Sequence, residues 1–161
     1  MNWIVNTYAA VTSVLSRLQS PLLLAIRLYW GVQLGLDGWR KLHNLNRVAE
    51  YFATLNMPMP AHTALFVSLV ELIGGIALAI GLLTRLTALV LFINMTVAFL
   101  AAEKDAFFAV FSDPDKFQGA SAYNDWFAVL LILVLGPGLF AIDTLVNKRL
   151  LAKREGAHSL V

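Results

Sequence analysis

Four long apolar segments, at residues 20–38, 61–83, 86–102 and 126–146, constrain the fold of this chain. A helix that crosses a bilayer needs about 20 apolar residues, and only a helix or a closed barrel satisfies its own backbone groups in hydrocarbon. Hydrophobic residues make up 59% of the 161 positions and charged residues 14%, against about 45–50% and about 25% in soluble domains. The sequence therefore predicts an all-α fold, an integral membrane four-helix bundle that forms a single domain in the lipid bilayer.

Two polar segments, 39–60 and 103–125, connect the predicted spans on one side of the membrane. Within 42–56, apolar residues recur at helical spacing, and Pro58 and Pro60 then break the pattern. We expect a short interfacial helix here, after the first span. The 103–125 segment mixes phenylalanines with acidic residues, a composition suited to capping the bundle in the headgroup region.

Three further features bear on the ends of the spans. The amphipathic stretch 4–18 has helical spacing and either lies on the membrane surface or lengthens the first span. No basic region precedes a small-residue cleavage site, so we expect the first span to be retained. A kink is expected in the fourth span at Gly136-Pro137-Gly138, because proline removes a backbone donor.

The predicted orientation depends on the C-terminal tail, 147–161. With four spans both termini lie on one side, and this tail carries the basic cluster Lys148, Arg149, Lys153 and Arg154. Because basic residues near span ends favour the cytoplasm, we expect a bacterial or archaeal cytoplasmic (inner) membrane protein with both termini cytoplasmic. The basic tail indicates contact with anionic lipid headgroups and not with nucleic acid.

Glu71 lies near the centre of the second apolar segment. Estimates of the cost of a charge at the bilayer centre run from about 2.5 to more than about 10 kcal/mol, so such a residue normally faces protein and has a partner. We expect that partner to be Arg27, which interrupts the first apolar segment. A buried ion pair is weak evidence for stability alone, so both a structural pair and a ligand- or proton-handling site remain open.

Polar and small residues share faces on the predicted helices. At about 100° per residue, Arg27, Asp37 and Lys41 fall within about 80° of one another, with Gly31 and Gly38 beside them. Glu71, Ser68 and Gly75 share a face of the second span, and Asn94 lies on a similar face of the third. Small residues allow helix backbones to approach closely. Helix packing is therefore the simpler interpretation of the glycines, Ser68 and Asn94.

These residues also carry a family resemblance. The relevant segments are Arg27 with Gly31, Gly35 and Gly38-Trp39-Arg40-Lys41, then Ala49-Glu50-Tyr51-Phe52-Ala53, Met57-Pro58-Met59-Pro60, and Glu71-Leu72-Ile73-Gly74-Gly75 with Gly81 and Thr84-Arg85. In order and spacing the set resembles the DoxX family of small four-helix membrane proteins, over about 21–146. Members often carry His or Asn just before the glycine of the first turn, where this chain has Asp37.

The resemblance implies membrane redox chemistry, because the related DoxD-type subunit belongs to a thiosulfate:quinone oxidoreductase. A quinone site would then use Arg27 as a donor, Glu71 as the proton-exchanging group and Asn94 at the second carbonyl, with Trp30 or Tyr29 stacking on the ring. Asp37 and Lys41 are further ligand- or proton-handling candidates. The chain would serve as a quinone-binding or non-catalytic subunit beside a soluble or peripheral redox protein, without catalytic residues of its own.

Other chemistries and functions can be compared with this one. The chain has no cysteine and three scattered histidines, so we expect no haem, iron–sulfur cluster or metal. A small proton-linked transporter would use Glu71 as a relay at the midplane. A structural membrane scaffold would use the polar faces only to hold helices together, and a homo-oligomer is compatible with any of these functions.

Overall fold

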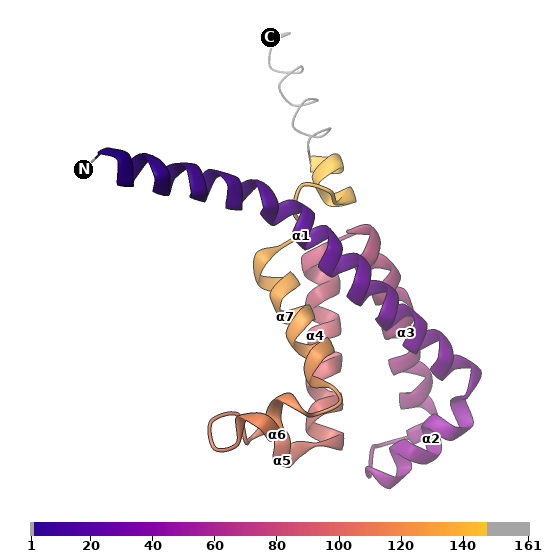
Figure 1. Ribbon diagram of the computed structural model, residues 1–161. Helices are drawn as coiled ribbons and strands as arrows, with labels where there is room; N and C mark the ends of the chain where they lie inside the picture. Colours follow the sequence, from indigo (N-terminus) through magenta and orange to yellow (C-terminus); the bar gives the residue numbers. More distant parts are fainter. Residues whose placement is uncertain (1, 148–161) are drawn as a thin grey trace, which may run out of the picture.

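The computed structural model describes residues 2–147. Over that range it contains helices joined by turns and loops, and no strands, as the sequence predicted. Figure 1 shows the helices in order: α1 (Asn2–His43), α2 (Leu45–Thr54), α3 (Pro60–Ile80), α4 (Thr84–Ala102), α5 (Lys104–Phe107), α6 (Pro114–Gln118) and α7 (Tyr123–Leu135). Helix α2 lies where the interfacial helix was expected. The tail residues 148–161, on which the predicted orientation depends, lie outside the described part.

Three of these helices are long and apolar enough to cross a membrane, namely α1, α3 and α4. Helix α7 is apolar but has only 13 residues. The expectation of a kinked helix over 126–146 is wrong, because α7 ends at Leu135 and the chain becomes helical again only at 142–147. Gly136 and Gly138 have φ values of 85° and 70°, a conformation that no right-handed helix contains.

Helices α1 and α3 pack closely because glycines line their contact. A Cβ atom on Gly31 would lie 2.7 Å from the backbone nitrogen of Ala79 and 2.8 Å from the carbonyl oxygen of Gly75. A Cβ atom on Gly38 would lie 2.7 Å from the carbonyl oxygen of Ser68. Only residues without a side chain allow the two backbones to approach this closely. The packing role expected for these glycines is confirmed.

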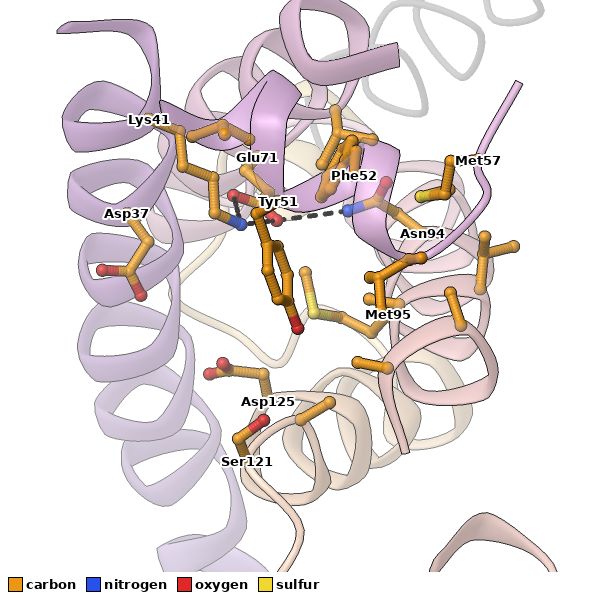
Figure 2. Close-up of a pocket in the computed structure, with 18 of the residues that line it drawn as sticks. Asp37, Lys41, Tyr51, Phe52, Met57, Glu71, Asn94, Met95, Ser121 and Asp125 are labelled. Carbon is orange, nitrogen blue, oxygen red and sulfur yellow. Dashed lines mark hydrogen bonds and ion pairs between the residues drawn. The ribbon is translucent and has the colours of Figure 1, made fainter. Parts of the chain in front are cut away.

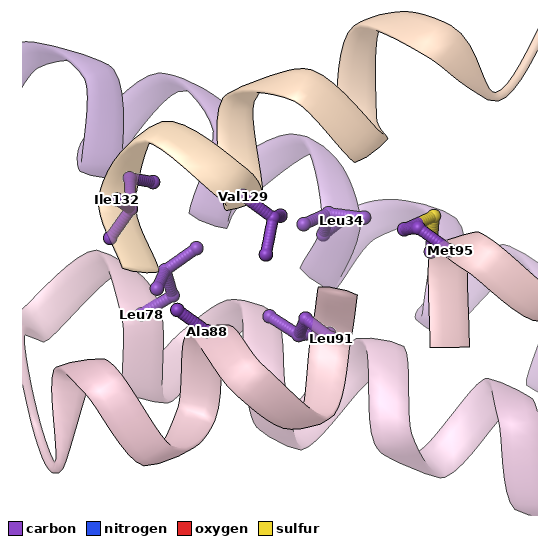
Figure 3. Close-up of a cluster of buried hydrophobic side chains, with 7 residues drawn as sticks. All are labelled: Leu34, Leu78, Ala88, Leu91, Met95, Val129 and Ile132. Carbon is purple, nitrogen blue, oxygen red and sulfur yellow. The ribbon is translucent and has the colours of Figure 1, made fainter. Parts of the chain in front are cut away.

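The hydrophobic core lies between α1, α3, α4 and α7 (Figure 3). Each helix contributes buried side chains to one cluster, which comprises Leu34, Leu78, Ala88, Leu91, Met95, Val129 and Ile132. Although α7 is short, Val129 and Ile132 are fully buried in this cluster. The core therefore fixes α7 against α4 and the first span.

A second cluster closes one end of the bundle. It is built on Phe99 of α4 with Ala106 and Ala120, and Phe107, Phe117 and Trp126 pack against it. The Phe99 and Phe117 rings stack with centroids 5.5 Å apart. The segment between α4 and α7 thus caps the bundle through its aromatic residues. We call this the α2 end, since α2 also lies here, and we call the opposite end the α3–α4 turn end (Figure 1).

Candidate functional site

A pocket of about 430 Å³ opens among α1, α2, α3, α4 and α7 near the α2 end. Figure 2 shows the side chains that converge on it. Its polar lining comprises Asp37, Lys41, Arg47, Tyr51, Glu71, Asn94, Ser121 and Asp125. The rest is mainly apolar, and it includes Leu34, Val48, Phe52, Leu55, Met57, Val67, Met95 and Val97. The pocket therefore combines one polar cluster with a hydrophobic body.

Glu71 forms the polar centre of this pocket, and its partner is Lys41. The Lys41 Nζ donates to both carboxylate oxygens of Glu71 at 2.5 Å. Glu71 is almost fully buried, whereas the side chain of Lys41 is 35% exposed. The predicted pairing of Glu71 with Arg27 is therefore wrong.

The register between α1 and α3 explains the different partner. Gly31 lies opposite Gly75 and Ala79, and Gly38 lies opposite Ser68 and Leu72. Because the two helices run in opposite directions, Glu71 lies nearly level with Gly38. Lys41 lies about one turn further along α1, and its long side chain reaches back to the Glu71 carboxylate. In the same register, Arg27 lies beside Gly81 at the other end of α3.

Four of the predicted candidates meet in the pocket: Asp37, Lys41, Glu71 and Asn94. Asn94 Nδ2 lies 3.5 Å from Glu71 Oε1, a long contact that links α4 to the ion pair. Asp37 lines the pocket and also accepts a hydrogen bond from Arg40 Nη1 at 2.9 Å. Three helices thus deliver charged or amide groups to one wall.

Four polar residues of the pocket were not identified as candidates from the sequence: Arg47, Tyr51, Ser121 and Asp125. Asp125 lies in the first turn of α7 and lines the pocket opposite α1, and Tyr51 projects into the pocket from α2 (Figure 2). An acidic residue at the start of an apolar helix was the available signal for Asp125. For Tyr51 the available signal was weaker, since an aromatic residue on an interfacial helix is common.

Arg27, Tyr29 and Trp30 lie away from the pocket. Arg27 is fully buried, and its Nη2 donates to the carbonyl oxygen of Phe140 at 2.8 Å. Tyr29 and Trp30 pack edge to face with ring centroids 5.1 Å apart, and Tyr29 is exposed. None of the three lines the pocket, so the roles expected for them in a quinone site do not fit this structure.

Arg27 instead helps to hold the segment that follows α7. Within this segment, the Asp143 carboxylate accepts hydrogen bonds from the backbone N–H groups of Leu83 and Thr84, both at 2.7 Å, and so caps α4. Partial burial raises the pKa of Asp143, but these hydrogen bonds and the Arg27 charge outweigh it and hold that pKa below its ordinary value. Arg27 and Asp143 therefore have a structural role, because they hold the segment after α7 against the α3–α4 turn.

The described residues offer no group of three or more His, Cys, Asp or Glu side chains placed to hold a metal ion. The pocket instead provides hydrogen-bond donors, a proton acceptor and aromatic surface. Lys41 and Asn94 can donate hydrogen bonds, and Glu71 can accept a proton. Tyr51 and Phe52 supply aromatic surface beside them. The arrangement suits a small ligand with polar atoms at one end of an apolar body.

Comparison with known proteins assigns the chain to a family. A sequence model of the DoxX family matches residues 22–104, about half of the chain. The chain belongs to the DoxX family. It is 30% identical to the inner membrane protein YqjF of Escherichia coli (strain K12) over 115 residues, which cover 70% of this chain and 82% of YqjF. No solved structure matches this DoxX-family protein.

The matched DoxX region contains Lys41, Glu71 and Asn94, whereas Asp125 lies beyond it. Family membership and three span-length apolar helices together make this chain an integral membrane protein. The resemblance noted in the sequence is therefore confirmed. The pocket is the part of this DoxX-family protein from which its ligand and its partners can be inferred.

Proposed function

We propose that this DoxX-family protein is a quinone-binding membrane subunit of an oxidoreductase. The observation that carries the proposal is the convergence of Lys41 Nζ and Asn94 Nδ2 on the buried Glu71 carboxylate at the wall of a largely apolar pocket. A quinone needs hydrogen-bond donors for its carbonyl oxygens, a proton source and an apolar slot. The pocket contains all three kinds of group.

The size and lining of the pocket support a ligand of this class. A volume of about 430 Å³ lies within the range of about 300–1,000 Å³ typical of small-molecule sites. Lys41 and Asn94 would donate to a carbonyl oxygen, while the Tyr51 and Phe52 rings would lie against the quinone ring. Val97 lines the pocket and is also half exposed, so an isoprenoid tail has an apolar exit along α4.

Reduction of a quinone to a quinol takes up two electrons and two protons. The carboxyl groups of Glu71, Asp37 and Asp125 line the same pocket and would pass protons to the two carbonyl oxygens. The electrons would come from a soluble or peripheral redox protein docked on this subunit. In this proposal the chain binds and protonates the quinone, and its partner supplies the reducing power.

The relative YqjF of Escherichia coli is an inner membrane protein by name. We place this chain in the same kind of bacterial membrane, where quinones reside. The basic residues of its tail support a cytoplasmic location for both termini. In that orientation the α2 end and its pocket face away from the cytoplasm.

Direct quinone binding to the purified chain in nanodiscs tests the proposal. We expect equilibrium binding of a short-chain ubiquinone or menaquinone analogue, with affinity lost at least about tenfold in Lys41→Met and Glu71→Gln, since truncating one partner of a buried charged pair typically costs more than about 1.4 kcal/mol. Glu50→Gln is the matched control, because Glu50 is exposed on α2 and does not line the pocket. Purification from native membranes should also recover a redox-active partner protein.

Other results would favour the other functions. If Glu71→Gln bound the quinone as well as the unmodified chain, the proposed site would be wrong. Proton-coupled flux in liposomes from the chain alone, lost in Glu71→Gln, would support a transporter. An effect of Glu71→Gln on assembly alone, without quinone binding or flux, would support a scaffold.

A further inference from the structure

The N-terminal half of α1 extends beyond the bundle. Every side chain at positions 5–19 is exposed, and the contact of Ser20 with the rest of the chain is a hydrogen bond that its Oγ accepts from the Leu139 backbone nitrogen at 3.3 Å. Figure 1 shows this half leaving the α3–α4 turn end, with no other described helix packed along it. About half of the longest helix is therefore without a protein partner in the described chain.

The length of α1 places this half outside the hydrocarbon core. Helices α3 and α4 have 21 and 19 residues, or about 31 and 28 Å, which matches the core thickness of about 30 Å. Helix α1 has 42 residues, or about 63 Å. Its C-terminal half, which packs on α3, already accounts for one crossing. The N-terminal half must continue into water or turn along the membrane surface.

The pattern of residues on this half distinguishes the two arrangements. Apolar side chains occupy an arc of about 140° at about 100° per residue, and this arc contains Trp3, Tyr8, Val11, Val14, Leu15 and Leu18, all exposed. Thr7 is the one polar residue within the arc. The opposite side carries mainly Ser, Thr, Asn and Gln, with Val5 and Ala9 among them. Such a helix standing in water would expose a continuous apolar stripe.

The charge of this segment also indicates whether electrostatic attraction or apolar burial would hold it on a bilayer. Arg17 is its only charged residue between positions 2 and 20, and it lies outside the apolar arc. Electrostatic attraction to anionic headgroups is worth about 1 kcal/mol per basic residue, so a single arginine contributes little. Apolar burial must supply most of the affinity for a bilayer, and Trp3 and Tyr8 are residue types enriched at the membrane interface.

A proline marks where the direction of α1 changes. Pro21 lies inside the helix, and its ring crowds the carbonyl group four residues earlier, that of Arg17, while it donates no hydrogen bond itself. Figure 1 shows α1 bending where it reaches the bundle. A bend at this point allows the N-terminal half to lie along the membrane surface while the C-terminal half crosses the bilayer.

We propose that residues 2–20 form an interfacial helix that lies on the bilayer at the α3–α4 turn end. Its arc from Trp3 to Leu18 faces the acyl chains, and its Ser- and Thr-rich side faces water. The partner is the lipid surface itself, neutral or anionic. The proposal is independent of the quinone site, which lies at the other end of the bundle.

Because the sequence contains no cysteine, a single introduced cysteine can be labelled without a competing site. Single cysteines are introduced at Val11 and Ser13, and at Leu18 and Ser16, in the full chain, and each is labelled with a nitroxide in nanodiscs that hold one chain. The two positions of each pair lie on opposite faces at nearly the same place along the helix. Collision with oxygen reports exposure to acyl chains, and collision with a nickel chelate reports exposure to water.

We expect Val11→Cys and Leu18→Cys to collide with oxygen severalfold more, and with nickel severalfold less, than Ser13→Cys and Ser16→Cys. The pattern should be the same in phosphatidylcholine alone and with phosphatidylglycerol added. Nickel access at all four positions would overturn the proposal, because the helix would then stand in water. Protection at all four would overturn it in favour of a protein partner, and a pattern confined to anionic lipid would overturn the role of apolar burial.

Discussion

The Lys41 ammonium group lies 2.5 Å from both carboxylate oxygens of Glu71 and joins α1 to α3 inside the bundle. A surface pair near it, Arg40 with Asp37 at 2.9 Å, involves side chains that are 67% and 42% exposed. Burial distinguishes the two pairs, since a desolvated charge without a partner is costly and a hydrated one is not. The exposed Arg40–Asp37 pair can therefore serve as the control for the buried Lys41–Glu71 pair.

Removing one partner of the buried pair should cost more than removing both. We expect Lys41→Met to lower the free energy of unfolding by about 3 kcal/mol, the lower end of the range for buried pairs, because Lys41 is partly exposed. The double variant Lys41→Met with Glu71→Leu should recover part of this loss. Unfolding in mixed micelles gives the coupling energy, and strict additivity of the single changes would contradict the pairing.

The control cycle uses Arg40→Met and Asp37→Asn. These side chains are largely exposed, so we expect a coupling energy of at most about 1 kcal/mol. A coupling as large as that of Lys41 and Glu71 would mean that burial does not distinguish the pairs.

Glycine substitutions should test the register of α1 on α3. A Cβ atom on Gly31 would meet backbone atoms of α3 at 2.7–2.9 Å, and a backbone cannot rotate away as a side chain can. We expect Gly31→Ala to destabilise the protein by about 1–3 kcal/mol. Gly35→Ala is the matched control, because its Cβ would lie at 3.8–3.9 Å from Ile76 and Leu72. Equal thermal stability of the two variants would argue against the close helix contact.

The contribution of Asp143, the cap of α4, to stability should decrease as the pH falls. Because the folded-state pKa of Asp143 is lowered, its contribution is fully present above the unfolded pKa and is lost as pH falls through the folded value. We expect Asp143→Asn to cost about 1 kcal/mol at pH 7, with a smaller difference below the ordinary pKa of 3.8. Thermal melts of both proteins across this acid range provide the measurement.

Asp105→Asn is the control for that experiment, since Asp105 is exposed in the short helix α5. Its substitution should leave stability almost unchanged at either pH. A difference between Asp143→Asn and the unmodified protein that grows in acid would contradict the lowered pKa.

Substitutions at Arg27 and in the pocket should affect different properties of the protein. Arg27 bonds the carbonyl oxygen of Phe140 at the α3–α4 turn end, away from the pocket. We expect Arg27→Lys to lower thermal stability, because lysine lacks the planar fork of donors, and to leave quinone affinity unchanged. Lys41→Met should lower quinone affinity instead. Loss of quinone binding in folded Arg27→Lys protein would show that the two ends are coupled.

Much of the architecture could be predicted from hydropathy alone. The apolar segments 61–83 and 86–102 correspond closely to α3 and α4, because lipid forces each such segment to bond its own backbone. The glycine faces and the polar candidates Asp37, Lys41, Glu71 and Asn94 could also be read from helical periodicity. These features depend on local spacing along single helices.

The end of α7 and the partner of Glu71 were decided only by the tertiary structure. Periodicity shows which residues share a face of one helix, but it does not show how far that helix is shifted along its neighbour. That shift depends on where glycine backbones meet, at Gly31 and Gly38, and it brings Lys41 rather than Arg27 to Glu71. Asp125 and Tyr51 join the same pocket only because α7 and α2 fold against it. The sequence by itself determined the helices and their polar faces, and packing between helices decided which polar groups meet.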